Sequence, residues 1–161
     1  MSARPILARD DKPAAVDDFV AGLQAAIDAA DADGFNAAFA TDVLWGSPFG
    51  LVVDGYDQIH PVHKRMFDAA AERRRAEGGS DGGSRYEVEH ARQVSDDVAL
   101  AFVRRLSLAA ADTDTGDQDG PQAGRPEGFD ELALFVLVRR DGAWWLAAGL
   151  HTPDRRKEAY G

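Results

Sequence analysis

Two polar side chains, His90 and Arg104, interrupt alternating stretches that otherwise read as a β-hairpin with one apolar face. Residues 86–108 alternate on both sides of a short acidic turn, which is typical of two antiparallel strands. In that hairpin His90 lies opposite Phe102 and diagonal to Arg104 on the apolar face. Histidine moves protons near neutral pH, and arginine binds an anionic or enolate-like oxygen. The pair is therefore the first candidate for catalysis, unless both groups reach water or Arg104 pairs with an acidic residue.

A third titratable candidate, His63, lies on the apolar stripe of a helix predicted over residues 56–77. Two interpretations stay open: a buried histidine with a satisfied hydrogen bond, or a pocket-facing group that contacts a ligand or acts as an acid or base. His60, at i−3, is spaced to share a metal ion with His63, but no third ligand is visible. The chain has no cysteine, which excludes disulfides, thiolate catalysis and cysteine-ligated zinc. We therefore expect neither a metal nor a cofactor.

Several aromatic side chains are predicted to point inward, where they either pack in the core or line a cavity between sheet and helices. The turn at residues 47–50 is expected to shape the mouth of that cavity. His151 is predicted on the outer face of the last strand, unless a bulge near Gly149 turns it back. The candidate ligand-binding residues are Trp45, Ser47, Phe49, Phe67, Phe102, Trp144 and His151.

The elements that must position these residues begin with helices. Apolar periodicity predicts three of them, over residues 13–30, 34–40 and 56–77, with Asp33 as the N-cap of the second. Two short strands, at residues 43–45 and 51–53, flank the turn between the second and third helices.

The last two strands, residues 131–140 and 143–151, are joined by the two-residue turn Asp141-Gly142, which favours a tight hairpin. The first of them is apolar on both faces, whereas an antiparallel strand with one wet face alternates. The predicted helices can cover only one side of the sheet. We therefore expect a homodimer that forms through the outer faces of two sheets.

Length and charge limit the classes of protein further. The chain has 161 residues, and we expect one domain over residues 13–153, with a flexible arm at 1–12, a mobile hairpin loop at 111–128 and a tail at 154–161. A formal net charge of −10 argues against nucleic acid or an anionic membrane as a partner. Residues 1–12 have no apolar core of signal-peptide length, so a cytoplasmic location is expected.

Two parts of the sequence resemble a known family. The segment from Ile27 to Ile59 is similar to the pattern A-x-D…F-x-x-D-x…G…G-x-x-x-I of the nuclear transport factor 2-like superfamily, and Arg139 to Pro153 is similar to the ending R-D-G-x-W-x-I-A-A-x-x-N-T-P of its SgcJ/EcaC-type (SnoaL-like) family. His151 stands where that family usually has asparagine. The resemblance covers roughly residues 16–153 and implies a cone-shaped α+β fold, with a strongly curved mixed or antiparallel sheet covered by about three helices.

Ketosteroid isomerases share that fold, and comparison with them excludes their chemistry here. Their catalytic carboxylate precedes the proline of the strand-turn, where this chain has Ser47, a poor general base without an activating neighbour. Their oxyanion-donating tyrosine corresponds to Leu23, which donates nothing.

Three functions remain open. The first is a protein whose pocket binds a small hydrophobic or polyketide-like molecule, which the resemblance places among accessory proteins of bacterial natural-product metabolism. The second is a SnoaL-like isomerase, cyclase or dehydratase that uses His90, His63 and Arg104. The third is a dimeric association domain without a ligand. An enzyme requires His90 or His63 in a closed cavity, whereas an association domain requires that the cavity be filled.

Overall fold

The computed structural model describes residues 3–9, 13–76, 83–108 and 129–155. The loop predicted at 111–128, and the greater part of the predicted tail, lie outside the described residues. The elements, in chain order, are α1 (Ala14–Asp28), α2 (Ala32–Asn36), β1 (Phe39–Gly46), β2 (Val52–Asp54), α3 (Tyr56–Ala76), β3 (Ser84–Ser95), β4 (Val98–Ser107), β5 (Glu131–Arg140) and β6 (Ala143–Pro153).

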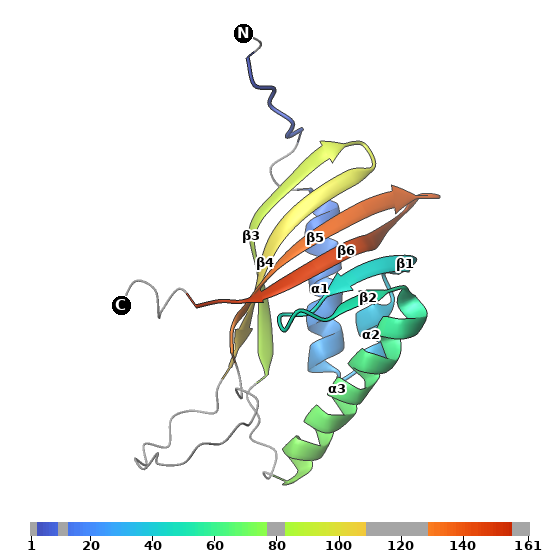
Figure 1. Ribbon diagram of the computed structural model, residues 1–161, viewed down its shortest axis with the longest axis vertical. Coiled ribbons are helices and arrows are strands. Elements are labelled where there is room, and N and C mark those ends of the chain that lie inside the picture. The colour runs from blue at the N-terminus through green and yellow to red at the C-terminus, as the bar shows by residue number, and fades with distance from the viewer. Residues whose placement is uncertain (1–2, 10–12, 77–82, 109–128, 156–161) are drawn as a thin grey trace.

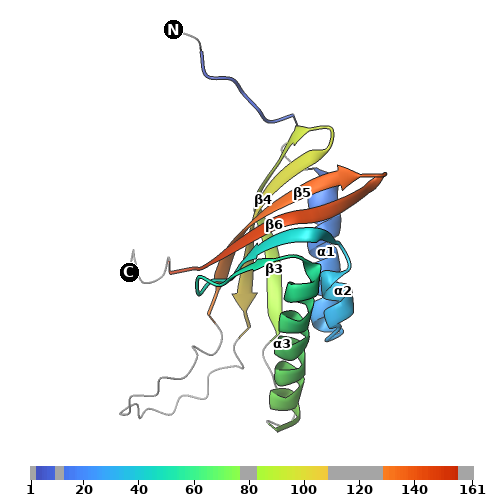
Figure 2. The ribbon, with the colours of Figure 1, turned by 45° about the vertical axis from the view of Figure 1, so that its right-hand side comes forward.

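The six strands form one mixed, curved sheet in the order β2-β1-β6-β5-β4-β3 (Figure 1). Strands β1 and β6 pair in parallel, and every other neighbouring pair is antiparallel. All three helices lie on one side of the sheet, as the rotated view shows (Figure 2). The predicted α+β fold, with helices covering one face of a strongly curved sheet, is confirmed. We call the side toward the helices the interior face and the other side the outer face.

The facing of β4 differs from the prediction. Its small residues Ala99 and Ala101 are buried on the interior face, whereas Phe102 is 43% exposed on the outer face. Helix α1 packs over β3 and β4 with the apolar stripe of Val16, Phe19, Val20 and Leu23. A helix approaches a sheet closely over alanine, and the larger residues of the strand then face outward. Size was therefore a misleading guide to which face of β4 is buried.

The boundaries of the second helix and the first strand were also predicted too late in the chain. Asp31, not Asp33, is the N-cap of α2, because its side chain accepts a hydrogen bond from the backbone N–H of Gly34 at 3.0 Å. The helix ends at Asn36, and β1 already begins at Phe39. This early start lets Phe39 reach the core beneath β6.

A β-bulge in β6 decides which residues face the interior. Leu137 pairs with Leu146, but the next residue back, Val136, pairs with Ala148, so Ala147 is an extra residue. Beyond the bulge, odd-numbered residues occupy the interior face, and His151 lies opposite Ala133 there. The exception allowed in the prediction therefore applies: a bulge in this segment is present, and it turns His151 to the interior face.

We expect Gly149→Ala to lower the free energy of unfolding by about 1–3 kcal/mol. A Cβ at this position would lie 3.2 Å from ring carbons of both Phe135 and Trp45. Gly22→Ala is the matched control, since a Cβ at that helical position meets nothing within 4 Å; it should stabilise the protein by about 0.5–1 kcal/mol. Urea unfolding of both variants measures the difference, and equal effects would contradict the tight packing at Gly149.

Candidate functional site

Polar side chains from four strands and one helix gather on the interior face. Across the ladders, Tyr86 pairs with Arg105, Arg105 pairs with Glu131, and Ala133, two residues further along β5, pairs with His151. Cross-strand partners share one face of a sheet, and this is the face of the buried core. His63 of α3 is buried toward the same core. We call His63, His151, Glu131, Arg105 and Tyr86 the interior polar set.

His63 is 4% exposed and is enclosed by aromatic rings. The rings of Phe35, Phe39 and Trp45 meet it edge-on at centroid distances of 5.0, 5.8 and 4.9 Å. Burial lowers the pKa of His63 to about 3, and His151 and His60 add to the effect. The imidazole is therefore neutral at ordinary pH.

A hydrogen-bond relay fixes the tautomer of His63. Asn36 donates through Nδ2 to the carbonyl oxygen of Ala32 at 2.7 Å, so its Oδ1 faces Nδ1 of His63, also at 2.7 Å. Because Oδ1 can only accept, Nδ1 of His63 carries the hydrogen. Nε2 then carries a free lone pair, which points away from Asn36.

His151 has the same tautomer for a different reason. Its Nδ1 lies 3.0 Å from the carbonyl oxygen of Gly46, which only accepts, so Nδ1 is the donor and Nε2 the acceptor. The ring packs on Trp45 at a centroid distance of 4.1 Å. Burial lowers the pKa of His151, although the charge of Glu131 and the bond to Gly46 oppose the shift. The indole of Trp45 thus contacts both histidines.

Within the described ranges, both Nε2 atoms lack a protein partner and are only partly buried. In the part of the chain that the structure describes, neither atom has a hydrogen-bond partner. Within that same part, no fully buried side-chain nitrogen or oxygen lacks a partner. The two Nε2 atoms are therefore not fully buried, even though the His63 side chain is almost entirely enclosed.

The remaining members of the set form a charge-neutral cluster. Arg105 donates through Nε to Glu131 at 2.8 Å and through one terminal nitrogen to the Ser84 hydroxyl at 3.0 Å. Burial disfavours the charge of Arg105, but its pKa is raised overall by the hydrogen bond to Glu131 and the charge of that carboxylate. Burial raises the pKa of Tyr86, so its hydroxyl stays protonated.

The pair predicted for catalysis lies on the other side of the sheet. His90 does pair with Phe102, as expected, but it is exposed, and both residues face outward with Arg104. A bulge between Val88 and His90 brings Glu89 to Arg104. The prediction that His90 and Arg104 face a pocket is wrong.

Arg104 has two acidic partners, as the alternative interpretation required. Its guanidinium forms ion pairs with Glu89 and with Asp154. The hydrogen bond that Arg104 donates to Glu89 is the main cause that raises the pKa of Arg104. Because two carboxylates already neutralise the charge of Arg104, its guanidinium does not attract an anionic ligand.

The aromatic predictions divide into two groups. Trp45 is buried, Phe67 packs on Phe35 at 5.5 Å, and Trp144 packs against the core, so these three face inward as expected. Phe49 is 70% exposed, and its predicted inward position is wrong. Its ring meets that of Phe129 edge-on at a centroid distance of 5.5 Å.

Ser47 has a structural role in that turn. Its hydroxyl accepts hydrogen bonds from the backbone N–H groups of Phe49 at 3.3 Å and Leu51 at 3.0 Å. Both bonds hold the turn between β1 and β2 closed, which is the work of a turn-forming serine.

Sequence reasoning missed Tyr86, Arg105, Glu131 and Asn36. Three of them follow from the facing of β4: once Ala99 and Ala101 are placed inward, alternation also puts Arg105 inward, and its partners Tyr86 and Glu131 with it. The run of small residues was the available signal. Asn36 had none, because nothing in the sequence shows that it lies beside His63.

The described residues contain neither a metal-binding cluster nor a membrane-spanning helix. No group of three His, Cys, Asp or Glu side chains in that part of the chain is arranged to hold a metal ion. No helix there is long and apolar enough to cross a membrane.

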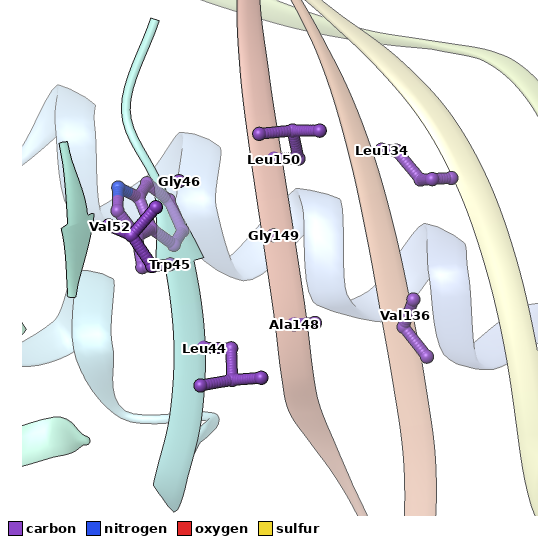
Figure 3. A pocket seen from close by; sticks show the side chains of 9 residues that line it. All are labelled: Leu44, Trp45, Gly46, Val52, Leu134, Val136, Ala148, Gly149 and Leu150. Carbon is purple, nitrogen blue, oxygen red and sulfur yellow. The ribbon is translucent and has the colours of Figure 1, made fainter. Parts of the chain in front are cut away.

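The outer face carries a shallow apolar hollow of about 220 Å³ (Figure 3). Exposed apolar side chains surround it: Leu44 is 50% exposed, Val52 73% and Leu150 61%. Leu134 and Val136 of β5 complete its lining. The strand that was predicted to be apolar on both faces therefore presents one of them to the outside.

No protein-family profile matches the sequence, and no curated protein matches it. Solved structures do match. An uncharacterised protein with a cystatin-like fold from Caulobacter vibrioides is 20% identical, with 91% of this chain and 92% of that chain covered and a TM-score of 0.64.

Two further structures have TM-scores of 0.60. One is a putative calcium/calmodulin-dependent protein kinase type II association domain from Thiobacillus denitrificans, 19% identical over 94% of this chain and 99% of that chain. The other is a ketosteroid isomerase-like protein from Erwinia carotovora atroseptica, 18% identical over 87% and 94%. Proteins of unknown function described as NTF2-like also match. The chain thus has the cystatin-like or NTF2-like fold, and identities this low show the fold alone.

Proposed function

We propose that this chain is a small-molecule-binding protein whose ligand lies between the sheet and the helices. The observation that carries the proposal is the interior polar set: among the described residues neither histidine Nε2 has a hydrogen-bond partner, and aromatic rings pack against both side chains. Apolar walls with a few convergent polar groups are the usual composition of a ligand site. The resemblance to the SgcJ/EcaC-type family suggests a polyketide-like ligand of bacterial natural-product metabolism.

Binding is favoured over catalysis by the protonation state of His63. A general base works best with a pKa near the operating pH, and the pKa of His63 is about 3. A base this weak takes up almost no proton at neutral pH. We therefore assign His63 to holding a ligand, and we assign no catalytic role to the outward-facing His90 and Arg104.

We also propose that the protein is a homodimer that buries the outer face. A band of exposed leucine and valine side chains on one face of a sheet is a typical contact surface, and here it coincides with the hollow between β1, β5 and β6. The similarity to a putative association domain supports association, although it shows the fold alone. An association domain without a ligand is the second candidate function, and the near-complete burial of His63 among aromatic rings favours it.

A ligand screen with a matched pair of variants tests the first function. Ala133→Leu adds a side chain on the interior face opposite His151, whereas Ala148→Leu adds the same bulk on the outer face opposite Val136. We expect apolar compounds to raise the melting temperature of the wild type and of Ala148→Leu, and Ala133→Leu to lose at least tenfold in affinity.

Two outcomes would contradict the interior site. The first is that no compound from an apolar, hydroxyl-rich library binds. The second is that hits bind Ala133→Leu normally and Ala148→Leu poorly, which would place the ligand in the outer hollow.

A further inference from the structure

We infer that the interior site selects an uncharged, apolar molecule that donates hydrogen bonds, such as a phenol or an alcohol, to Nε2 of His63 and Nε2 of His151. The inference rests on the proposed function and names the chemical class of its ligand. It depends on three features: the tautomers, their shared neighbour and the charge of the site.

The tautomers make both histidines acceptors. Asn36 Oδ1 lies 2.7 Å from Nδ1 of His63, and the Gly46 carbonyl oxygen lies 3.0 Å from Nδ1 of His151. Each oxygen requires a hydrogen on the nitrogen that it faces, so the second nitrogen of each neutral ring has only a lone pair. A ligand must therefore bring the hydrogens.

One aromatic surface connects the two acceptors. The indole of Trp45 contacts His63 at 4.9 Å and His151 at 4.1 Å, and Phe135 contacts His151 at 5.6 Å. Aromatic walls favour a flat apolar ligand body. No described residue bonds to either Nε2, so a ligand that lacks donors leaves both acceptors desolvated and unpaired, which is costly.

The charge of the site excludes an anion or a cation. Arg105 and Glu131 neutralise each other at 2.8 Å, and the carboxylate occupies the guanidinium that would otherwise attract an anion. Tyr86 and both histidines are uncharged at neutral pH. An ionic ligand would lose its hydration without gaining an opposite charge.

Three matched probes test the ligand class on the wild-type protein: 4-butylphenol, 4-butylanisole and 4-butylbenzoate. All three share the same apolar body. The phenol carries a hydrogen-bond donor, the anisole an oxygen capped by a methyl group, and the benzoate a negative charge. Titration calorimetry should show 4-butylphenol binding at least tenfold more tightly than either analogue. His151→Phe keeps an aromatic ring against Trp45 and should reduce the preference for the phenol over the anisole, whereas His90→Phe, at an exposed site, should not.

The outcomes separate the two proposals. Equal or tighter binding of the anisole or the benzoate overturns the ligand class and leaves the interior site standing. Absence of binding by all three probes, or binding that Ala133→Leu leaves unchanged, overturns the interior site and the ligand class together. The comparison of probes uses the wild type alone, so it holds even if His151→Phe fails to fold.

Discussion

Leu150→Glu is expected to convert the proposed dimer into a monomer, with a loss of a hundredfold or more in dimer affinity. Leu150 is 61% exposed beside the outer hollow. In a twofold dimer each substitution occurs twice, and each copy loses about 1.5–3 kcal/mol of apolar burial and adds the cost of burying a carboxylate. Light scattering and sedimentation across a concentration series measure the change.

Met66→Glu is the matched control for this experiment. Met66 is 60% exposed, nearly the same as Leu150, but it lies on α3 rather than on the sheet. The two substitutions change the net charge equally, so a difference between them reports position. A dimer that survives Leu150→Glu and dissociates with Met66→Glu would place the interface on the helices, and a monomeric wild type would refute the dimer.

Acidification from pH 7.5 to pH 5 is expected to lower the free energy of unfolding by about 2 kcal/mol through His63 alone. The unfolded chain binds a proton on His63 below its ordinary pKa of 6.5, whereas the folded protein binds it only near pH 3. The contribution of His63 to stability is therefore complete above pH 6.5 and is lost as the pH falls from 6.5 toward 3. The lowered pKa of His151 acts in the same direction.

Urea unfolding of His63→Gln separates this effect from general acid sensitivity. Glutamine stays neutral at both pH values and keeps an N–H group for Asn36. The decrease in the free energy of unfolding between pH 7.5 and pH 5 should therefore be smaller than in the wild type by about 2 kcal/mol. His90→Gln is the control, because His90 is exposed on the outer face, and it should keep the wild-type loss. An unchanged pH dependence in His63→Gln would show that the folded protein tolerates a charged His63.

The sequence was sufficient for the fold because its signals there are local. The stripe from Val16 to Leu23 predicts α1, and Asp141-Gly142 predicts the last hairpin, where the structure shows Arg140 paired with Ala143. Both patterns involve residues close in the chain. The alternate apolar residues of β5 likewise indicate a second apolar face, since they follow one another closely in the chain.

The candidate site was harder to predict because it depends on the facing of strands. The prediction took the larger residues of β4 as the buried ones. It therefore placed Phe102 and Arg104 inside and Arg105 outside, so the two faces of the strand were exchanged. Two bulges, at Glu89 and Ala147, then changed the facing of their neighbours. A bulge adds one residue without a clear sequence signal, so alternation alone does not locate it.

The bulge at Ala147 also has an evolutionary consequence. Removing that one codon would leave β6 as a regular strand in which Leu146, Gly149 and His151 keep the interior face, because the extra residue is the one without a partner. Inserting a codon in the same segment would instead turn His151 outward, unless the strand bulged twice. We therefore expect the fold to tolerate a deletion at this point of β6 more readily than an insertion.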